Sequence, residues 1–136
     1  MPHSTDIRIR WGDTDAGGLI YYPRFFHFVV IGLNDYFSIA TSGEHPMEYY
    51  RKQGYLLPAV EASASFYSPL RAGDRAVIQT EVLDSGDASL TIGFVITREG
   101  VDAADGEVTF VFVDSDFQPT SLPNDIHQCI QVRESD

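Results

Sequence analysis

The stretch with the clearest chemical potential is the turn GDTDAGG at residues 12–18, which holds two aspartates and three glycines. Glycines allow positive φ and a close approach of backbone to ligand. The chain then enters a long apolar segment at Pro23, a residue suited to the first turn of a helix. A carboxylate can act as nucleophile or general base, and helix N-terminal amides favour developing negative charge. The combination predicts a minimal acyl-transfer site built from Asp15 and the amides near Tyr22.

Two other interpretations of this turn follow from the residue types alone. Asp13 and Asp15 are both common formers of Asx turns, and the glycines then only permit the bend. The spacing of Asp13, Asp15 and Gly18 also fits positions one, three and six of a calcium loop. Gly17 and Arg24 occupy the fifth and twelfth positions, and the twelfth requires a bidentate glutamate, so calcium is excluded.

The elements that position the turn can be predicted from periodicity. Ile7, Ile9 and Trp11 alternate with charged residues, which predicts a half-buried strand over residues 5–11 with these three side chains inward. A long helix is predicted from Pro23 until just before Gly43. Because this helix is apolar over most of its circumference, we expect a curved sheet to bury it.

The rest of the chain reads as one short helix followed by strands. The helix is predicted over residues 46–52. Turn signals then separate four meander-like antiparallel strands at residues 56–67, 75–84, 88–98 and 105–113. A polar tail follows, and from about residue 118 it is expected to be loosely held. The pattern predicts a single α+β domain over residues 1–136, with a helix on one face of an antiparallel sheet.

Composition excludes several classes of protein. A formal net charge of -11 opposes binding to nucleic acid or to an anionic membrane. Cys129 is the only cysteine, so the chain can form neither an intramolecular disulfide nor a zinc site made of cysteines. The Cys129 thiol also lacks a histidine at a suggestive spacing, which argues against a nucleophilic role. No signal peptide or apolar span is visible in the sequence, so we expect a cytoplasmic protein.

Two segments of the chain resemble a known family. The segment RWGDTDAGGLIYYPRFFHF is similar to the N-terminal signature of hotdog-fold acyl-CoA thioesterases, of the 4-hydroxybenzoyl-CoA thioesterase type. The segment LLPAVEASASFYSPLRAGDRAVIQTEV resembles the second and third strands of that family. The resemblance implies a hotdog fold, in which a five-stranded antiparallel sheet wraps around one long central helix.

The resemblance also implies an activity and a site. The expected reaction is hydrolysis of a small aromatic (4-hydroxybenzoyl- or benzoyl-like) or short-chain acyl-CoA. No cofactor is expected, because coenzyme A is part of the substrate, and no metal is expected either. The family's catalytic aspartate falls on Asp15, its oxyanion donor on the Tyr22 backbone amide, and Asp13 is then a turn residue. A homodimer at least is expected, and a homotetramer beyond it. The residues expected to line the substrate site, some of them from the partner, are Tyr21, Gly17, Gly18, His27, Pro58, Ser63 and Ser65.

The sequence departs from the family in two places. Residues 84–89 carry no basic side chain, although relatives can hold the coenzyme A phosphates at this place. Arg71, Arg75 or Arg98 could bind the phosphates instead. The alternative is a substrate carried on a carrier protein. Val30 stands where relatives can place an acid. A lone histidine such as His27 also suits a structural or interface role. A hotdog-fold hydratase or dehydratase and a non-catalytic acyl-thioester binding module are the competing functions.

Overall fold

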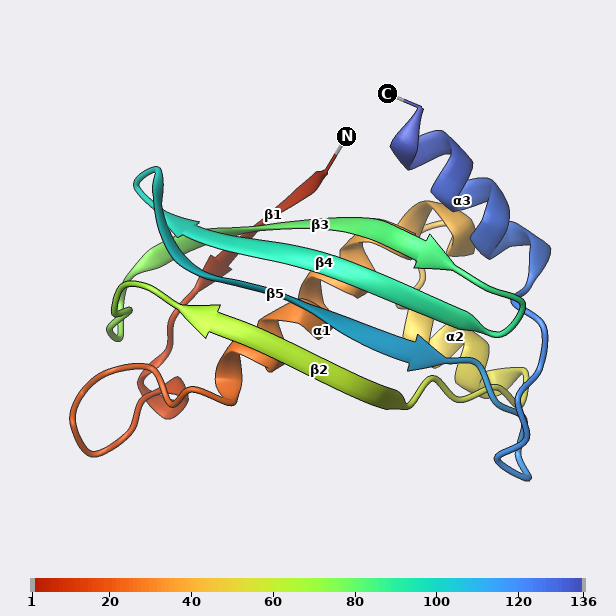
Figure 1. Cartoon of the computed structure of the whole chain (residues 1–136), viewed down its shortest axis with the longest axis horizontal. Helices are drawn as coiled ribbons and strands as arrows, with labels where there is room; N and C mark the ends of the chain where they lie inside the picture. Colours follow the sequence, from red (N-terminus) through yellow and green to blue (C-terminus); the bar gives the residue numbers. More distant parts are fainter. Residues whose placement is uncertain (1, 136) are drawn as a thin grey trace.

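The computed structural model describes residues 2–135 and shows one antiparallel sheet curved around a long helix (Figure 1). The five strands lie in the order β1-β3-β4-β5-β2. This confirms the expected α+β architecture with a central helix. The strands are β1 (His3–Arg8), β2 (Ala59–Phe66), β3 (Arg75–Ser85), β4 (Ser89–Arg98) and β5 (Val101–Val111), and the helices are α1 (Arg24–Phe37), α2 (Pro46–Lys52) and α3 (Asn124–Glu134).

The helix α1 forms because its apolar residues recur at helical spacing and the concave face of the sheet covers them. Phe25, Phe28, Val29 and Leu33 are each at most 3% exposed. Full burial of one such side chain contributes roughly 1.5–3 kcal/mol. A β-carbon at Gly32 would lie 2.7 Å from the Thr80 side chain, so glycine lets this helix approach β3 closely.

The end of the long helix differs from the prediction. Regular α-helix stops at Phe37, and the chain continues as a 3-10 turn, η2 (Ser38–Thr41). Ser42 and Gly43 then take positive φ values of 54° and 86° and end the helical path. The sequence could not separate these two kinds of helix, since apolar residues continue beyond Phe37 at Ile39 and Ala40.

The strand order also corrects the expected meander. β3, β4 and β5 are consecutive neighbours, but β2 lies at the far edge and pairs with β5, with Ala62 opposite Val108 and Ala64 opposite Gly106. A β-carbon at Gly106 would lie 2.1 Å from the Ser63 carbonyl oxygen, so only glycine allows this pairing. The fifth strand begins at Val101 rather than near residue 105, because only a tight turn separates it from β4.

Trp11 was wrongly predicted to be buried. It is 86% exposed, because β1 ends at Arg8 and Trp11 begins a short 3-10 turn, η1 (Trp11–Asp13). Ile7 and Ile9 are buried as expected.

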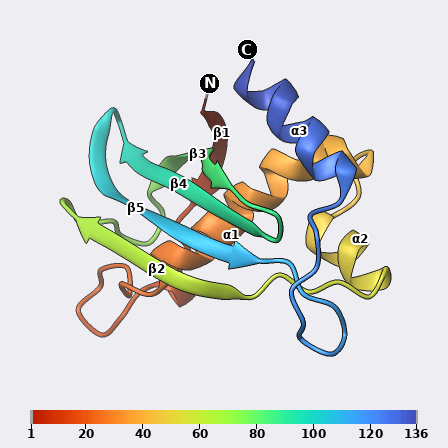
Figure 2. The same ribbon diagram turned by 45° about the vertical axis from the view of Figure 1, so that its right-hand side comes forward.

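The polar tail was wrongly predicted to be loosely held. Its last part is α3, which packs beside the C-terminal half of α1 (Figure 2). Ile126 and Cys129 are buried at this contact. The Tyr36 hydroxyl donates to Oε1 of Glu134 at 2.7 Å, and burial together with that carboxylate raises the Tyr36 pKa. Across residues 2–135, none of the helices has the length and apolar character needed to cross a membrane.

Candidate active site

The aspartate-rich turn forms a small hairpin between β1 and α1, at the end of the sheet away from α3 (Figures 1 and 2). The Asp15 amide donates to the Leu19 carbonyl at 2.8 Å, and the Tyr21 amide donates to the Asp13 carbonyl at 2.8 Å. Thr14 and Ile20 form a bridge between these two bonds. The hairpin therefore fixes Asp13 beside the start of the helix and Asp15 nearer the tip.

Asp13 is the buried anchor of the turn, with only 4% of its surface exposed. Its Oδ2 accepts the Arg10 amide at 2.8 Å, and its Oδ1 accepts Nε and Nη2 of Arg24 at 3.0 and 2.7 Å. Burial alone would raise the pKa of Asp13, but these hydrogen bonds and the charge of Arg24 outweigh it and lower the pKa. The anchored carboxylate joins the turn to the first residue of α1.

Asp15 carries an exposed carboxylate. Its Oδ1 accepts the Gly17 amide at 2.9 Å. The Gly18 amide donates to the Asp15 carbonyl at 3.0 Å, and Gly18 has a φ of 80°, a value that favours glycine. The two glycines thus shape the backbone around Asp15, and the second carboxylate oxygen keeps its hydrogen-bonding capacity.

The N-terminus of α1 supplies an open amide. The amides of Arg24 and Phe25 donate to the carbonyls of Tyr21 and Tyr22 at 2.8 and 3.2 Å. Over residues 2–135, no hydrogen-bond acceptor meets the Tyr22 amide. An amide without an acceptor at the positive end of a helix dipole can stabilise an oxyanion.

An aromatic hollow of about 320 Å³ lies beside that helix start. The Phe66 ring from the end of β2 lies 6.3 Å from the Tyr22 ring and 5.0 Å from the Phe25 ring. The Tyr21 and Tyr22 rings lie 5.5 Å apart with their planes tilted by 56°, and both side chains are at least half exposed. The hollow is lined by Leu19, Ile20, Tyr22, Phe25, Phe66, Tyr67, Ser68 and Pro69.

The single chain does not bring every expected residue to this place. Asp15 does not line the aromatic hollow, although Leu19, whose carbonyl accepts the Asp15 amide, does. Ser63 and Ser65 flank Ala64, which packs against the core, and so face the outer surface of the sheet. Ser63 lines a shallow hollow there. Pro58 precedes β2, and its carbonyl accepts the Val111 amide at 3.0 Å.

His27 lies in a different cleft, one of about 360 Å³ between β1 and α1. It shares this cleft with Arg10, Asp13 and Arg24, and its positive form helps to lower the Asp13 pKa. The geometry therefore places His27 beside the structural aspartate. Within residues 2–135, no three side chains of the His, Cys, Asp or Glu types are grouped to hold a metal ion.

Sequence reasoning missed the role of Arg24. The resemblance pointed to Asp15 as the catalytic residue but did not say what holds the Asp13 carboxylate in place. The available signal was an arginine at the first position of a helix, where a cation is disfavoured by the helix dipole unless a carboxylate meets it.

Comparison with known proteins gives the same interpretation of the fold. The profile of the thioesterase-like superfamily matches residues 9–130. A 1,4-dihydroxy-2-naphthoyl-CoA hydrolase from Thermosynechococcus vestitus is 29% identical over 96 residues, a match that covers 69% of this chain and 63% of that protein. The chain thus spans just under two thirds of the length of this relative.

Two crystal structures agree closely with the whole chain. A DHNA-CoA thioesterase from Staphylococcus aureus has a TM-score of 0.87 at 20% identity, with 98% of this chain and 91% of that one covered. A 1,4-dihydroxy-2-naphthoyl-CoA thioesterase from Synechocystis has a TM-score of 0.85 at 18% identity, with 96% of each chain covered. Identities this low show the fold alone. The profile match, which covers most of the chain, shows that this hotdog-fold protein belongs to the thioesterase-like superfamily.

Proposed function

We propose that this protein hydrolyses aromatic acyl-CoA thioesters to the free acid and coenzyme A. The observation that carries the proposal is the arrangement at the start of α1. The exposed Asp15 carboxylate and the open Tyr22 amide belong to one continuous segment, and Leu19, Ile20 and Tyr22 of that segment line the aromatic hollow together with residues 66–69. A carboxylate nucleophile, an oxyanion donor and an apolar acyl site are the parts that thioester hydrolysis requires.

Asp15 has two chemical routes. In the first, a carboxylate oxygen attacks the thioester carbonyl, the C–S bond breaks, and the thiolate leaves and takes a proton from water. Water then hydrolyses the mixed anhydride and regenerates the carboxylate. In the second, Asp15 removes a proton from a water molecule that attacks the carbonyl directly, the C–S bond breaks, and the thiolate leaves and takes that proton from Asp15. The Tyr22 amide stabilises the oxyanion in both routes.

The acyl group we propose is aromatic. The hollow is lined by Tyr22, Phe25, Phe66 and Tyr67, and aromatic rings favour edge-to-face or offset contacts with another ring. The relatives named above act on a dihydroxynaphthoyl thioester, which is also aromatic. The 4-hydroxybenzoyl or benzoyl group is the smaller candidate, and a short-chain acyl group is the alternative.

We propose that a second copy completes the site. β2 is an edge strand of eight residues that carries the exposed side chains of Val60 and Phe66 near its ends, and the exposed Tyr67 follows it directly. An open, exposed edge is a template for pairing with another strand. Pairing along β2 would cover the side of the aromatic hollow next to that strand. Pro58 of the second copy stays our candidate for its lining, whereas Ser63 and Ser65 face the outer surface of the sheet, away from the hollow. A homotetramer stays a prediction.

The decisive experiment measures thiol release from a panel of CoA esters with a thiol reagent. The panel contains benzoyl, 4-hydroxybenzoyl, 1,4-dihydroxy-2-naphthoyl, phenylacetyl and short aliphatic esters. Release of coenzyme A that is fastest with a hydroxyaryl ester supports the proposal. Tight binding without thiol release across the panel would instead identify a binding module, and hydration of an enoyl-CoA without thiol release would identify a hydratase. Sedimentation at assay concentrations tests the dimer.

A further inference from the structure

The cations of this acidic chain fall into two groups. The chain has nine lysines and arginines against twenty acids. Five of the nine are engaged: Arg24, Arg51, Lys52 and Arg98 pair with carboxylates, and Arg133 donates to the carbonyls of Asp35 and Tyr36. The other four have no carboxylate partner among residues 2–135, and they are Arg8, Arg10, Arg71 and Arg75.

All four unpaired arginines belong to the end of the sheet that carries the Asp15 hairpin. Arg8 lies directly opposite Arg75 in the pairing of β1 with β3. Arg71 forms a bridge with Leu19, the residue whose carbonyl accepts the Asp15 amide. Only a short turn separates Arg71 from Arg75, and the Gly73 amide of that turn donates to the Ile9 carbonyl at 2.8 Å. Backbone contacts therefore connect the arginines to the candidate active site.

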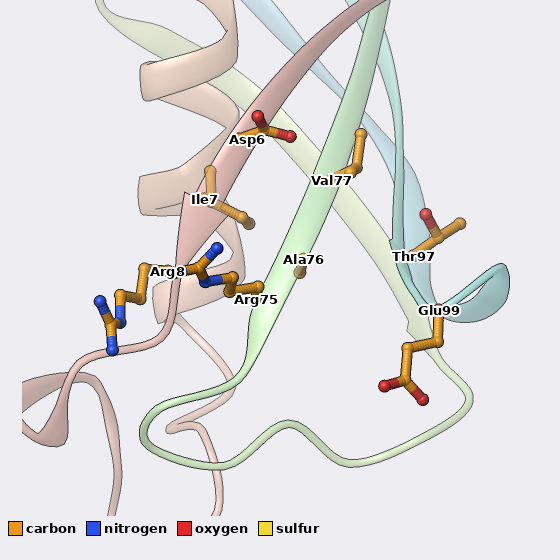
Figure 3. Close-up of a pocket in the computed structure, with 8 residues that line it drawn as sticks. All are labelled: Asp6, Ile7, Arg8, Arg75, Ala76, Val77, Thr97 and Glu99. Atoms are coloured by element: carbon orange, nitrogen blue, oxygen red, sulfur yellow. The ribbon is translucent and has the colours of Figure 1, made fainter.

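Arg8 and Arg75 line the same groove, which has a volume of about 400 Å³ (Figure 3). Figure 3 shows the Arg75 side chain reaching across toward Arg8, whose guanidinium group extends away from Arg75. Two carboxylates, those of Asp6 and Glu99, also line the groove, and Glu99 lies on its far side. Like charges directly opposite each other on paired strands are destabilising. A bound anion between the two guanidinium groups would remove that repulsion.

The turn at residues 84–89, which lacks the basic side chains that relatives can carry there, has another role in this chain. Asp87, in the turn between β3 and β4, accepts the Ser121 hydroxyl at 3.0 Å, and its carbonyl accepts the Leu122 amide at 2.8 Å. This turn therefore fixes the segment that leads into α3. Its negative charge and its contacts leave it unsuited to phosphate, so phosphate recognition requires a different place.

We propose that the groove between Arg8 and Arg75 binds the phosphates of the nucleotide part of the acyl-CoA substrate, with Arg10 and Arg71 adding to the positive field. This inference rests on the proposed function and assigns its anionic subsite. The planar guanidinium forms paired hydrogen bonds to phosphate oxygens, which makes arginine a suitable ligand. The pantetheine arm separates the thioester from the phosphates, so a subsite set apart from Asp15 fits the substrate.

The test compares acyl-CoA with acyl-pantetheine, which carries the same thioester without the nucleotide. In the R8Q/R75Q double variant, we expect KM for acyl-CoA to rise about tenfold, the loss expected when a hydrogen bond to a charged group is removed. KM for acyl-pantetheine should stay the same, and the acyl-CoA KM of the wild type should rise with salt more steeply than that of the variant. Arg51→Gln, which breaks an exposed pair on α2, is the matched control and should change neither KM.

Calorimetry with adenosine 3′,5′-bisphosphate separates this subsite from the hydrolase proposal. Binding by the wild type that R8Q/R75Q weakens supports the groove, even if no CoA ester is hydrolysed. An unchanged acyl-CoA KM in the variant overturns the subsite while the hydrolase proposal stands. An equal rise for both substrates also overturns it, since that result shows a distorted sheet. Arginine-dependent turnover confined to an acyl carrier protein would assign the groove to a protein partner and overturn it as well.

Discussion

The Gly17 amide donates to Oδ1 of Asp15 at 2.9 Å, and a β-carbon at position 17 would lie 3.2 Å from that same oxygen. Gly17→Ala should therefore displace the Asp15 carboxylate and lower kcat, while the melting temperature changes little because the residue is exposed. Gly12→Ala is the matched control, since a β-carbon there meets nothing within 4 Å. Equal kcat values for the two variants would show that the position of the carboxylate does not limit turnover.

Removing the Asp15 carboxylate tests the chemistry itself. Asp15→Asn should lower kcat by about 10²- to 10⁴-fold, the usual contribution of a positioned acid or base. Among residues 2–135, the only hydrogen bond of this exposed side chain is the one to the nearby Gly17 amide, so the melting temperature should be preserved. Asp116→Asn, in an exposed turn distant in sequence, is the control and should keep full activity. Wild-type turnover by purified Asp15→Asn would remove this residue from the mechanism.

Asp13 should behave differently from Asp15. Asp13→Asn weakens the contacts to the Arg10 amide and to Arg24, so we expect a loss of about 1–3 kcal/mol in the free energy of unfolding. Activity should fall through disorder of the turn and should recover in part at low temperature. Urea unfolding measures the stability, with Asp116→Asn again as the reference. A stable variant without activity would contradict the structural role.

Acid should destabilise the fold through two carboxylates. Burial alone would raise the pKa of Asp35. Hydrogen bonds from Thr5 and His3 and the charges of His3 and Arg133 outweigh burial and lower this pKa. The pKa of Asp13 is lowered as well. A carboxyl with a folded-state pKa below its ordinary value of 3.8 stabilises the fold above that pH. The stabilisation is lost as the pH falls through the lowered pKa. Unfolding measured from neutral pH downward should show this loss, and Asp35→Asn should reduce its slope.

The aromatic hollow predicts a change in substrate preference. Phe66→Ala removes the ring that packs against Tyr22 and Phe25, and an aromatic contact of this kind contributes about 0.5–1.5 kcal/mol. We therefore expect kcat/KM for aryl-CoA esters to fall several-fold, with a smaller change for acetyl-CoA. Phe117→Ala, at another exposed phenylalanine, should alter neither. An equal loss for aryl and acetyl esters would place the acyl group elsewhere.

Periodicity predicted the central helix and the strands β3 and β4 well, because their buried residues repeat at the spacing of their own element. The same reasoning failed at Trp11, where alternation continues after the strand has lost its partner. It also failed at α3, whose Ile126, Cys129 and Ile130 have helical spacing in an otherwise polar segment. Local patterns do not encode which strand pairs with which, so the pairing of β2 with β5 could not be predicted from periodicity.

The candidate site shows the same limit. The sequence identified the turn, yet the division of labour between Asp13 and Asp15 depends on the hairpin that turns one carboxylate toward Arg24 and leaves the other exposed. The anion groove depends on the register that sets Arg8 opposite Arg75. Both are relationships between segments, and neither appears in the spacing of residues along the chain.

The opposite edge of the sheet determines how far association can proceed. β1 has only six residues, and its outward positions include the charged Asp6 and Arg8. Short, charged border strands discourage the addition of another chain. If two molecules pair through β2, β1 becomes the edge strand at both ends of the ten-stranded sheet. Association in the plane of the sheet then stops at the dimer and does not continue into a fibre.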